Sequence, residues 1–289
     1  MRIFFFLFFA LTLHTGYAQN SKVLILYDME GISGVESHDQ ITMGKKGYET
    51  GRRLLTRDVN AAIRGLKAGG ATTIVVADAH GSGNKEADIL LEEMDTTARF
   101  DFRSLSNEPY IDCIDSTFDA VVCIGMHARA FTKGFIAHTY TDDISFNVNG
   151  HELTETDIIA LSAARFGIPV IMVSGDDVLQ QQLASYYPHL QYATVKYSKS
   201  FSLCTVLPET EAHQKIYESA RLAMQQYQTA AAYRTTAPFV FTLSFRTPKQ
   251  LKKALALEGT KRKDNRSLEF VADDFASGFK RALKVLPLF

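Results

Sequence analysis

Four short apolar runs, separated by helix-like stretches, constrain the fold of this 289-residue chain more than any other feature. They cover residues 22–28, 72–80, 119–127 and 168–177. Within each run the apolar residues occupy consecutive positions instead of every second one, which indicates strands that are covered on both faces. Such strands, alternating with helices, predict a three-layer α/β/α domain with a mainly parallel sheet.

Two of the intervening stretches carry helical signals. In residues 48–70, apolar side chains recur at helical spacing and glycines follow them. In residues 153–167, Thr154 and Asp157 resemble a capping box, and Gly167 ends the helix. These helices are expected to cover the faces of the sheet.

The pattern changes in the last third of the chain. Residues 238–245 and 267–272 resemble further strands, and residues 273–286 resemble a final helix. The sequence therefore predicts an α/β metal-binding catalytic domain of residues 21–190 and a smaller α+β C-terminal subdomain of residues 191–289.

The N-terminal residues 1–18 have the features of a secretory signal peptide. Arg2 precedes an apolar run at residues 3–13, and the small residues Gly16 and Ala18 follow. The run is too short for a comfortable membrane span, and no later segment reaches the roughly 18 apolar residues that a span requires. The sequence predicts an exported protein, periplasmic or secreted, with no stable membrane span after signal removal. An uncleaved N-terminal anchor is the alternative.

Charge and composition narrow the choice of partners. With 46% hydrophobic and 22% charged residues, the chain has the composition of an ordinary globular protein. Its 31 basic and 32 acidic residues nearly cancel, and no basic run stands apart from balancing acids. Because binding to a polyanion needs local positive charge, the sequence predicts no nucleic-acid partner.

Polar residues follow the end of each predicted strand. In a parallel α/β sheet, ligands bind at the carboxyl ends of the strands. The residues at these ends are Asp28 with Glu30, Asp78 with His80, His127, and Asp176 with Asp177. Each alone could be a turn former, but close carboxylates repel unless a cation lies between them. Carboxylates and imidazoles without thiolates favour Zn²⁺, with Mn²⁺ or Co²⁺ possible.

Four motifs carry a resemblance to a known family. They are "YDMEGISG", "DAHGSGN", "GMHARAFTKGFIAHT" and "NGHELTETDIIALSAARFGIPVIMVSGDD". In this order they resemble the DppA-like D-aminopeptidases, a family of dinuclear zinc peptidases, from residue 23 to about residue 180. The resemblance implies a zinc-dependent aminopeptidase that hydrolyses short peptides or amides with an N-terminal D-amino acid through a metal-bridged hydroxide. It also implies two Zn²⁺ per chain and a homo-oligomer.

The resemblance assigns roles to individual residues. It implies that Asp28 bridges the two zinc ions, that Glu30 and His127 complete one of them, and that His80 and Glu155 complete the other. It implies that His138 is the catalytic histidine, either stabilising the oxyanion or moving a proton to the leaving amine.

Glu155 enters the set through the resemblance alone, because it lies at the start of a helix and not at the end of a strand. Glu152 is a nearby competitor for this position. Asp78, Asp176 and Asp177 become secondary candidates that fix loops or orient the ligands. The export signal and the "GHELTETD" loop both depart from the family pattern, which leaves the natural substrate and the shape of the pocket open.

Two other functions are compatible with parts of the sequence. An aspartyl-phosphate-type Mg-dependent phosphatase would use "DMEGIS" and "SGDD", but it needs none of the three histidines at positions 80, 127 and 138. A non-catalytic secreted metal-binding protein would keep the fold and the ligands without turnover.

Overall fold

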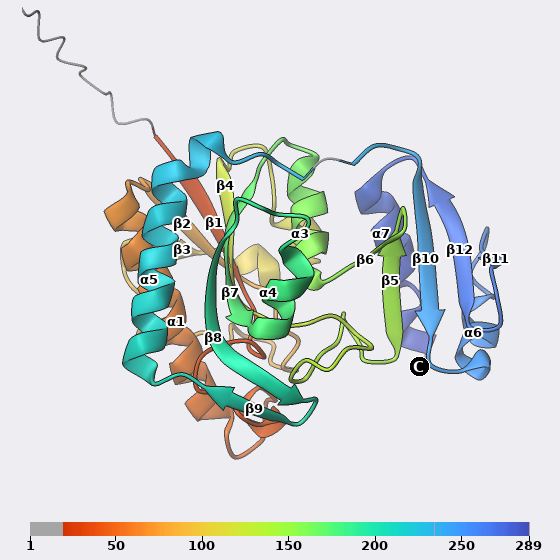
Figure 1. The fold of residues 1–289 in the computed structure, drawn as a ribbon, viewed down its shortest axis with the longest axis horizontal. Coiled ribbons are helices and arrows are strands. Elements are labelled where there is room, and N and C mark those ends of the chain that lie inside the picture. Colours follow the sequence, from red (N-terminus) through yellow and green to blue (C-terminus); the bar gives the residue numbers. More distant parts are fainter. Residues whose placement is uncertain (1–19, 234, 289) are drawn as a thin grey trace, which may run out of the picture.

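The computed structural model describes residues 20–233 and 235–288, and within them the chain forms two sheets (Figure 1). The larger sheet has seven strands in the order β3-β2-β1-β4-β7-β8-β9, and the smaller has five in the order β11-β12-β10-β5-β6. Residues 1–18, the predicted signal peptide, lie outside the described residues.

The larger sheet is mainly parallel, as the apolar runs predict. Its strands are β1 (Lys22–Tyr27), β2 (Thr73–Asp78), β3 (Ala98–Phe100), β4 (Ala120–Met126), β7 (Val170–Asp176), β8 (Gln191–Ser200) and β9 (Leu203–Val206). The six strands from β3 to β8 pair in parallel, and β9 pairs antiparallel with β8. Every residue of β4 and β7 is buried, which confirms that the central strands are covered on both faces.

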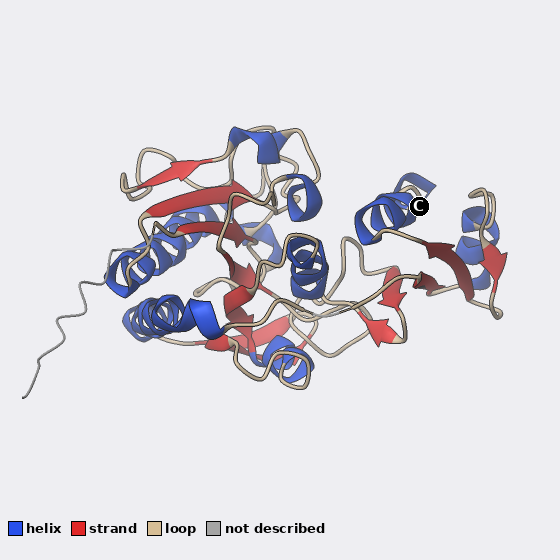
Figure 2. Ribbon diagram, turned by 90° about the horizontal axis from the view of Figure 1, so that it is seen from above, coloured by secondary structure: helices blue, strands red, loops and turns tan. Residues whose placement is uncertain are grey.

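Alternate residues of β1 enter two separate apolar layers. Val23, Ile25 and Tyr27 pack with α1 (Tyr48–Gly69) and α5 (Glu209–Gln226) on one face of the sheet. Leu24 and Leu26 pack on the other face, in the layer to which α2 (Pro109–Asp112), α3 (Glu155–Ala164) and α4 (Asp177–Leu183) contribute. Figure 2 shows helices on both sides of the larger sheet. The three-layer α/β/α fold is therefore confirmed.

The smaller sheet is antiparallel and apolar on its inner face. Its strands are β5 (Ile144–Val148), β6 (His151–Glu152), β10 (Phe239–Phe245), β11 (Lys261–Arg262) and β12 (Ser267–Ala272). Helices α6 (Pro248–Ala254) and α7 (Phe275–Leu283) pack against it. Phe241 stacks on Phe270 at 5.0 Å, and Phe275 stacks on Phe279 at 5.7 Å. Short 3-10 helices η1 (His38–Gln40), η2 (Phe102–Leu105), η3 (Tyr227–Thr229) and η4 (Leu286–Leu288) complete the fold.

The seven-stranded sheet forms the larger lobe of the structure, and the five-stranded sheet forms the smaller lobe. The division between these lobes differs from the predicted boundary at residue 190. β8, β9 and α5 belong to the larger lobe, because β8 pairs in parallel with β7. β5 and β6 belong to the smaller lobe, because Ile144 to Val148 pair with β10. Figure 1 shows β5 beside β10, far from β4, the strand that precedes it in sequence. The smaller lobe is thus built from two chain segments, an arrangement that local sequence patterns do not reveal.

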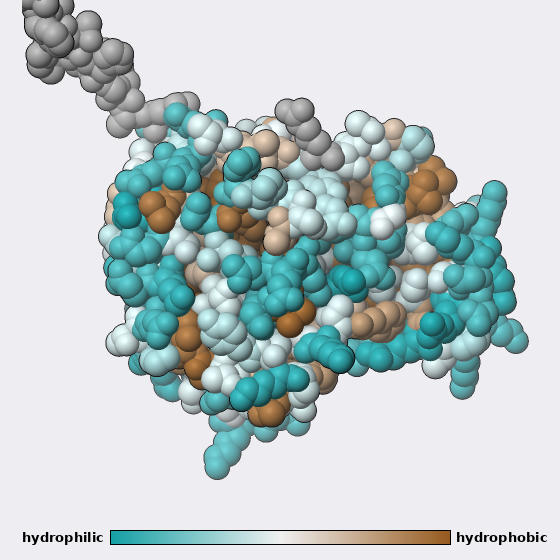
Figure 3. Space-filling model, in the orientation of Figure 1, coloured by the Kyte–Doolittle hydropathy of each residue, from teal (hydrophilic) through white to brown (hydrophobic). Residues whose placement is uncertain are grey.

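The surface is typical of a globular protein. On the face shown in Figure 3, hydrophilic side chains predominate and apolar ones lie in small separate groups. Among the residues that the structure describes, no helix is both long enough and apolar enough to cross a bilayer.

Candidate metal centre

Three adjacent strands of the larger sheet deliver acids and histidines to one point. β1 lies between β2 and β4, and all three run in the same direction. The side chains that come together are Asp28 and Glu30 after β1, His80 after β2, His127 after β4, and Glu155 at the start of α3. They are almost completely buried, and all except His127 line a cavity of about 340 Å³ that contains further acids. The structure thus brings the five expected ligands together.

Asp28 directs its two carboxylate oxygens to two different groups of residues. Asp28 Oδ1 lies 2.8 Å from His80 Nδ1, and that nitrogen lies 3.1 Å from Glu30 Oε2. Asp28 Oδ2 lies 3.3 Å from His127 Nε2, which is 3.6 Å from Glu155 Oε2. A carboxylate with one oxygen in each group has the position of a bridge between two cations.

Glu30 contacts His80, and Glu155 contacts His127. Glu30 also lies close enough to His127 and His138 to share a cation with them, so the pairing of Glu30 with His127 that the resemblance implied stays a prediction. β2 and β4 flank β1 on opposite sides and carry the two histidines to opposite sides of Asp28, so His80 and His127 belong to different groups in either pairing.

Each of the three histidines at the site directs one ring nitrogen to a backbone carbonyl group, His80 through Nε2 and the other two through Nδ1. His80 Nε2 contacts the Ile41 carbonyl at 2.8 Å, and His127 Nδ1 contacts the Ala128 carbonyl at 2.9 Å. His138 Nδ1 contacts the Ile136 carbonyl at 2.9 Å. A carbonyl oxygen only accepts hydrogen bonds, so each of these ring nitrogens carries the proton. In the neutral ring the other nitrogen then presents a lone pair to the carboxylates, and this arrangement is stable when a cation lies between them.

Two buried atoms at the centre lack a hydrogen-bond partner within the described part of the chain. They are Glu30 Oε2 and His127 Nε2. Both have a site atom within 3.3 Å, but the directions are wrong for a hydrogen bond. Buried polar atoms are rarely left without a partner. The donor set of three carboxylates and two imidazoles therefore fits zinc.

The pKa shifts at the site show that it stabilises positive charge. Burial and the charge of Glu30 raise the pKa of Asp28 to about 6. Burial acts to raise the pKa of Glu155, but the close contact with the His127 ring and its positive charge lower it to about 2. Burial acts to lower the pKa of His80, but the charge of Glu30 and the hydrogen bond to Asp28 raise it well above its usual value. A divalent cation meets the same electrostatic demand without a proton.

Two tyrosines hold the Glu155 carboxylate from both sides. The Tyr110 hydroxyl donates to Glu155 Oε2 at 2.6 Å, and the Tyr140 backbone N–H donates to Oε1 at 2.7 Å. Tyr140 has a positive φ of 59°, a conformation that is rare for a residue with a bulky side chain. Glu152, the competitor for the role of Glu155, is half exposed and pairs with Arg129 at 2.5 Å. Only Glu155 of these two glutamates therefore lies at the centre.

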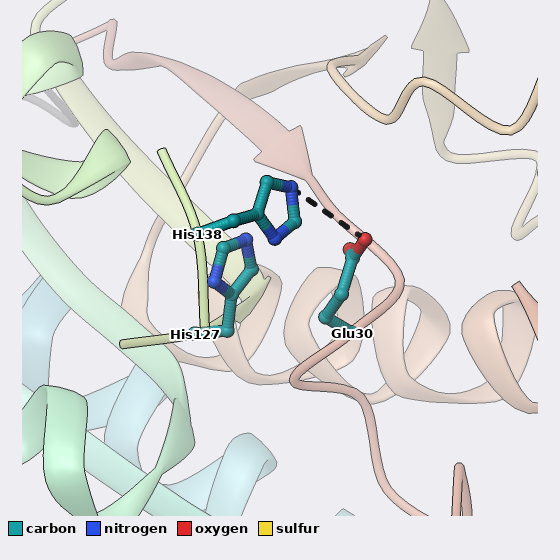
Figure 4. Close-up of side chains that lie close together, drawn as sticks. All are labelled: Glu30, His127 and His138. Carbon is teal, nitrogen blue, oxygen red and sulfur yellow. Dashed lines mark ion pairs between the residues drawn. The ribbon is translucent and has the colours of Figure 1, made fainter. Parts of the chain in front are cut away.

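His138 lies beside the ligand groups and is more accessible than they are. Its Nε2 is 3.9 Å from Glu30 Oε1 and 4.0 Å from Glu155 Oε1, and 22% of its side chain is exposed. Figure 4 shows its ring next to that of His127, with Glu30 opposite. This position at the cavity suits a group that meets the substrate.

The three secondary candidates hold loops instead of facing the centre. Asp78 accepts hydrogen bonds from the Tyr27 hydroxyl and from the backbone N–H of His80. Asp176 accepts from the backbone N–H of Ala128 and caps α4. Asp177 accepts from the N–H of Ser198. Asp78 and Asp176 therefore fix the backbone next to His80 and His127.

Sequence reasoning missed Tyr110, Tyr140 and the fully buried Lys196, which contacts the backbone of Glu30 at 2.6 Å. No local sequence pattern predicts these three residues. Each comes from a segment in which metal-ligand residues do not recur at helical or strand spacing. Their roles depend on contacts between distant parts of the chain.

Comparisons with known proteins identify the family of this chain. Residues 21–284 match the peptidase M55 family, described as D-aminopeptidase. A D-aminopeptidase of Bacillus subtilis (strain 168) is 27% identical over 271 residues, which cover 92% of this chain and 97% of that protein. The solved structure of the Zn-dependent D-aminopeptidase DppA from Bacillus subtilis, described as a self-compartmentalizing protease, matches with a TM-score of 0.86 at 26% identity, over 92% of this chain and 97% of that chain. The fold and the family resemblance are thereby confirmed, and the chain belongs to the peptidase M55 family of D-aminopeptidases.

Proposed function

We propose that this protein is a zinc-dependent D-aminopeptidase that hydrolyses short peptides or amides with an N-terminal D-amino acid. The family match supports this activity, and so does the zinc dependence of the structurally similar DppA. The single observation that carries the proposal is the placement of Asp28, with one carboxylate oxygen in each of two acid–histidine groups.

The proposed centre holds two zinc ions per chain, with Mn²⁺ or Co²⁺ as alternatives. Asp28 would contact both, His80 and His127 would each bind a different ion, and Glu30 and Glu155 would complete one ion each. When bound, such ions polarise a carbonyl group and lower the pKa of water toward neutrality. The carbonyl groups of Ile41 and Ala128 fix the ring orientation of the two histidines, so the donor atoms are in place before any ligand binds.

The tautomer of His138 supports a role in moving a proton. Because Nδ1–H donates to the Ile136 carbonyl, Nε2 is the atom that accepts a proton and later gives it up. In the leaving step this proton would go to the departing amine. Stabilisation of an oxyanion by the same nitrogen requires the ring to be protonated first.

The alternative functions leave more of the site unexplained. In an aspartyl-phosphate phosphatase Asp28 would be a free nucleophile, whereas both of its oxygens face histidines. A non-catalytic metal-binding protein would have no use for His138 at the edge of the cavity.

We also propose export and self-assembly. The N-terminal residues 1–18 support export to the periplasm or the medium, where peptides that contain D-alanine occur. The description of DppA as self-compartmentalizing supports a homo-oligomer.

The experiment is metal analysis of the purified mature protein together with hydrolysis assays. We expect two zinc ions per chain and cleavage of D-Ala-D-Ala and D-alanine amide, with the L-forms as matched controls. Cleavage of the L-forms alone, with the metal sites full, would refute D-specificity. One magnesium ion per chain with phosphatase activity would refute the peptidase.

A further inference from the structure

Lys196 is a fully buried lysine that reaches the loop carrying Glu30. It lies on β8, and none of its surface is exposed. Its Nζ donates to the carbonyl oxygens of Glu30 at 2.6 Å and Val35 at 2.8 Å. The ring of Phe135 lies 4.8 Å from the same nitrogen. The lysine thus holds both ends of the segment 30–35.

Within the described residues, no carboxylate lies within 4.0 Å of Lys196 to form an ion pair. Burial lowers the pKa of Lys196 to about 8. An ammonium group without a paired anion is expensive to bury, and such groups are commonly associated with function. Its hydrogen bonds to the two carbonyl groups and its position over Phe135 are the interactions that offset this cost.

Asp58 on α1 binds the same segment by accepting hydrogen bonds from donor groups of the segment. The Asp58 carboxylate, which is fully buried, accepts from the Ser33 backbone N–H at 2.8 Å and from the Ser33 hydroxyl at 2.6 Å. The Lys196 ammonium group therefore binds carbonyl groups of segment 30–35, and the Asp58 carboxylate binds the N–H and O–H groups of Ser33. Segment 30–35 is fixed between two opposite buried charges that belong to α1 and β8.

The contacts of Gly31 restrict the backbone conformation of the segment next to Glu30. Its N–H donates to the Gly125 carbonyl at 2.7 Å. A Cβ atom at this position would lie 1.8 Å from the Met126 carbonyl oxygen, so the backbone lies directly against β4. The carbonyl group directly before Gly31 belongs to Glu30, and it is the one that accepts a hydrogen bond from Lys196.

We propose that Lys196 is a positioning residue that fixes the Glu30 backbone and thereby aims the Glu30 carboxylate at the metal that Glu30 shares with Asp28. This inference rests on the two-zinc centre proposed above. Lys196 does not touch the reacting atoms. Its loss should therefore weaken one zinc ion selectively, in the same way as the loss of Glu30 itself.

The test is a zinc titration against a competing chelator on the folded proteins, with circular dichroism as the check of folding. We expect Lys196→Met to bind one zinc with the affinity of the unmodified protein and the other at least about tenfold more weakly. Val195→Ala is the matched control, because it opens a cavity at the neighbouring buried position of β8. It should bind both zinc ions with unchanged affinity.

Double variants identify which zinc is affected. Lys196→Met should add no further loss to Glu30→Gln, because both act on the same ion. In Glu155→Gln it should weaken the zinc ion that Glu155→Gln alone leaves unaffected. If Lys196→Met does not fold, Lys196→Gln replaces it, since its amide nitrogen is one bond shorter and cannot reach both carbonyl groups. The same selective weakening is expected.

Two results would overturn the inference about Lys196 and leave the proposed metal centre intact. The first is unchanged affinity for both zinc ions in the folded Lys196 variant, and the second is equal weakening of both. If the unmodified protein itself binds fewer than two zinc ions, the proposed metal centre fails and this inference fails with it.

Discussion

The imidazole rings of His127 and His138 stack at a centroid distance of 4.2 Å, with 16° between their planes. His127 is buried and directs Nε2 to Asp28 and Glu155. His138 keeps part of its ring exposed at the cavity. The contact places a proposed ligand and a proposed proton carrier side by side, each with its Nδ1–H held by a backbone carbonyl group.

Replacing His138 should separate catalysis from metal binding. We expect His138→Ala to lower kcat by about 10² to 10³-fold, because a positioned acid–base or oxyanion group contributes on that scale. Both zinc ions should remain, since the two acid–histidine groups stay intact without it. His189→Ala, at an exposed histidine away from the cavity, is the control. Loss of one zinc along with activity would instead identify His138 as a metal ligand.

The acids Asp28, Glu30 and Glu155 should differ in how many zinc ions depend on each of them. We expect Asp28→Ala to lose both zinc ions, because each oxygen of Asp28 faces one group. Glu30→Gln and Glu155→Gln should each weaken one ion. Metal content after gel filtration measures this directly, and Glu152→Gln is the control at an exposed neighbouring glutamate. Retention of one tightly bound zinc in Asp28→Ala would argue against a bridging role.

The hydroxyl of Tyr110 should matter for the zinc near Glu155. Tyr110→Phe removes the donor to Glu155 Oε2, and the loss of such an outer hydrogen bond lowers metal affinity by about 10 to 100-fold. Tyr140→Phe is a matched control, because the Tyr140 hydroxyl donates to Glu108 while its backbone N–H still holds Glu155. Chelator competition measures both variants. Equal effects of the two substitutions would contradict this assignment.

Asp78 should make the zinc-free protein less stable as the pH rises. Burial and the charge of Asp88 raise the pKa of Asp78 from 3.8 to about 7 in the folded state. The folded protein therefore binds more protons than the unfolded chain, and this contribution to stability is full below pH 4 and is lost as the pH rises to about 7. Urea unfolding at pH 5 and pH 7 should show a smaller loss of stability for Asp78→Asn than for the unmodified protein. An identical loss in both would show that Asp78 does not titrate in this range.

Local sequence patterns determined the strands and their polar ends. β1, β2, β4 and β7 lie within the predicted apolar runs, because consecutive burial on both faces leaves a clear signature in the sequence. The Thr154–Asp157 capping box is present as predicted, since a cap depends on residues three positions apart. Met29 is buried in the core while Asp28 and Glu30 face the cavity, as their alternation in the chain predicts.

Gly31 shows the limit of such local reasoning. A glycine after the two acids predicts a backbone turn that needs conformational freedom. In the structure Gly31 is required for a different reason, because its backbone lies against Met126 with no room for a side chain. The neighbour that imposes this restriction is almost one hundred residues away in the sequence.

The tertiary structure alone decided which distant segments meet. It joined β5 to β10, brought Glu30 and Glu155 to the two histidines that flank Asp28, and placed Lys196 behind the Glu30 loop. Periodicity reports whether a residue is buried, but not which of many apolar or polar surfaces it is buried against. That choice depends on the packing and hydrogen bonding of the whole chain at once, so it is made only when the strands assemble.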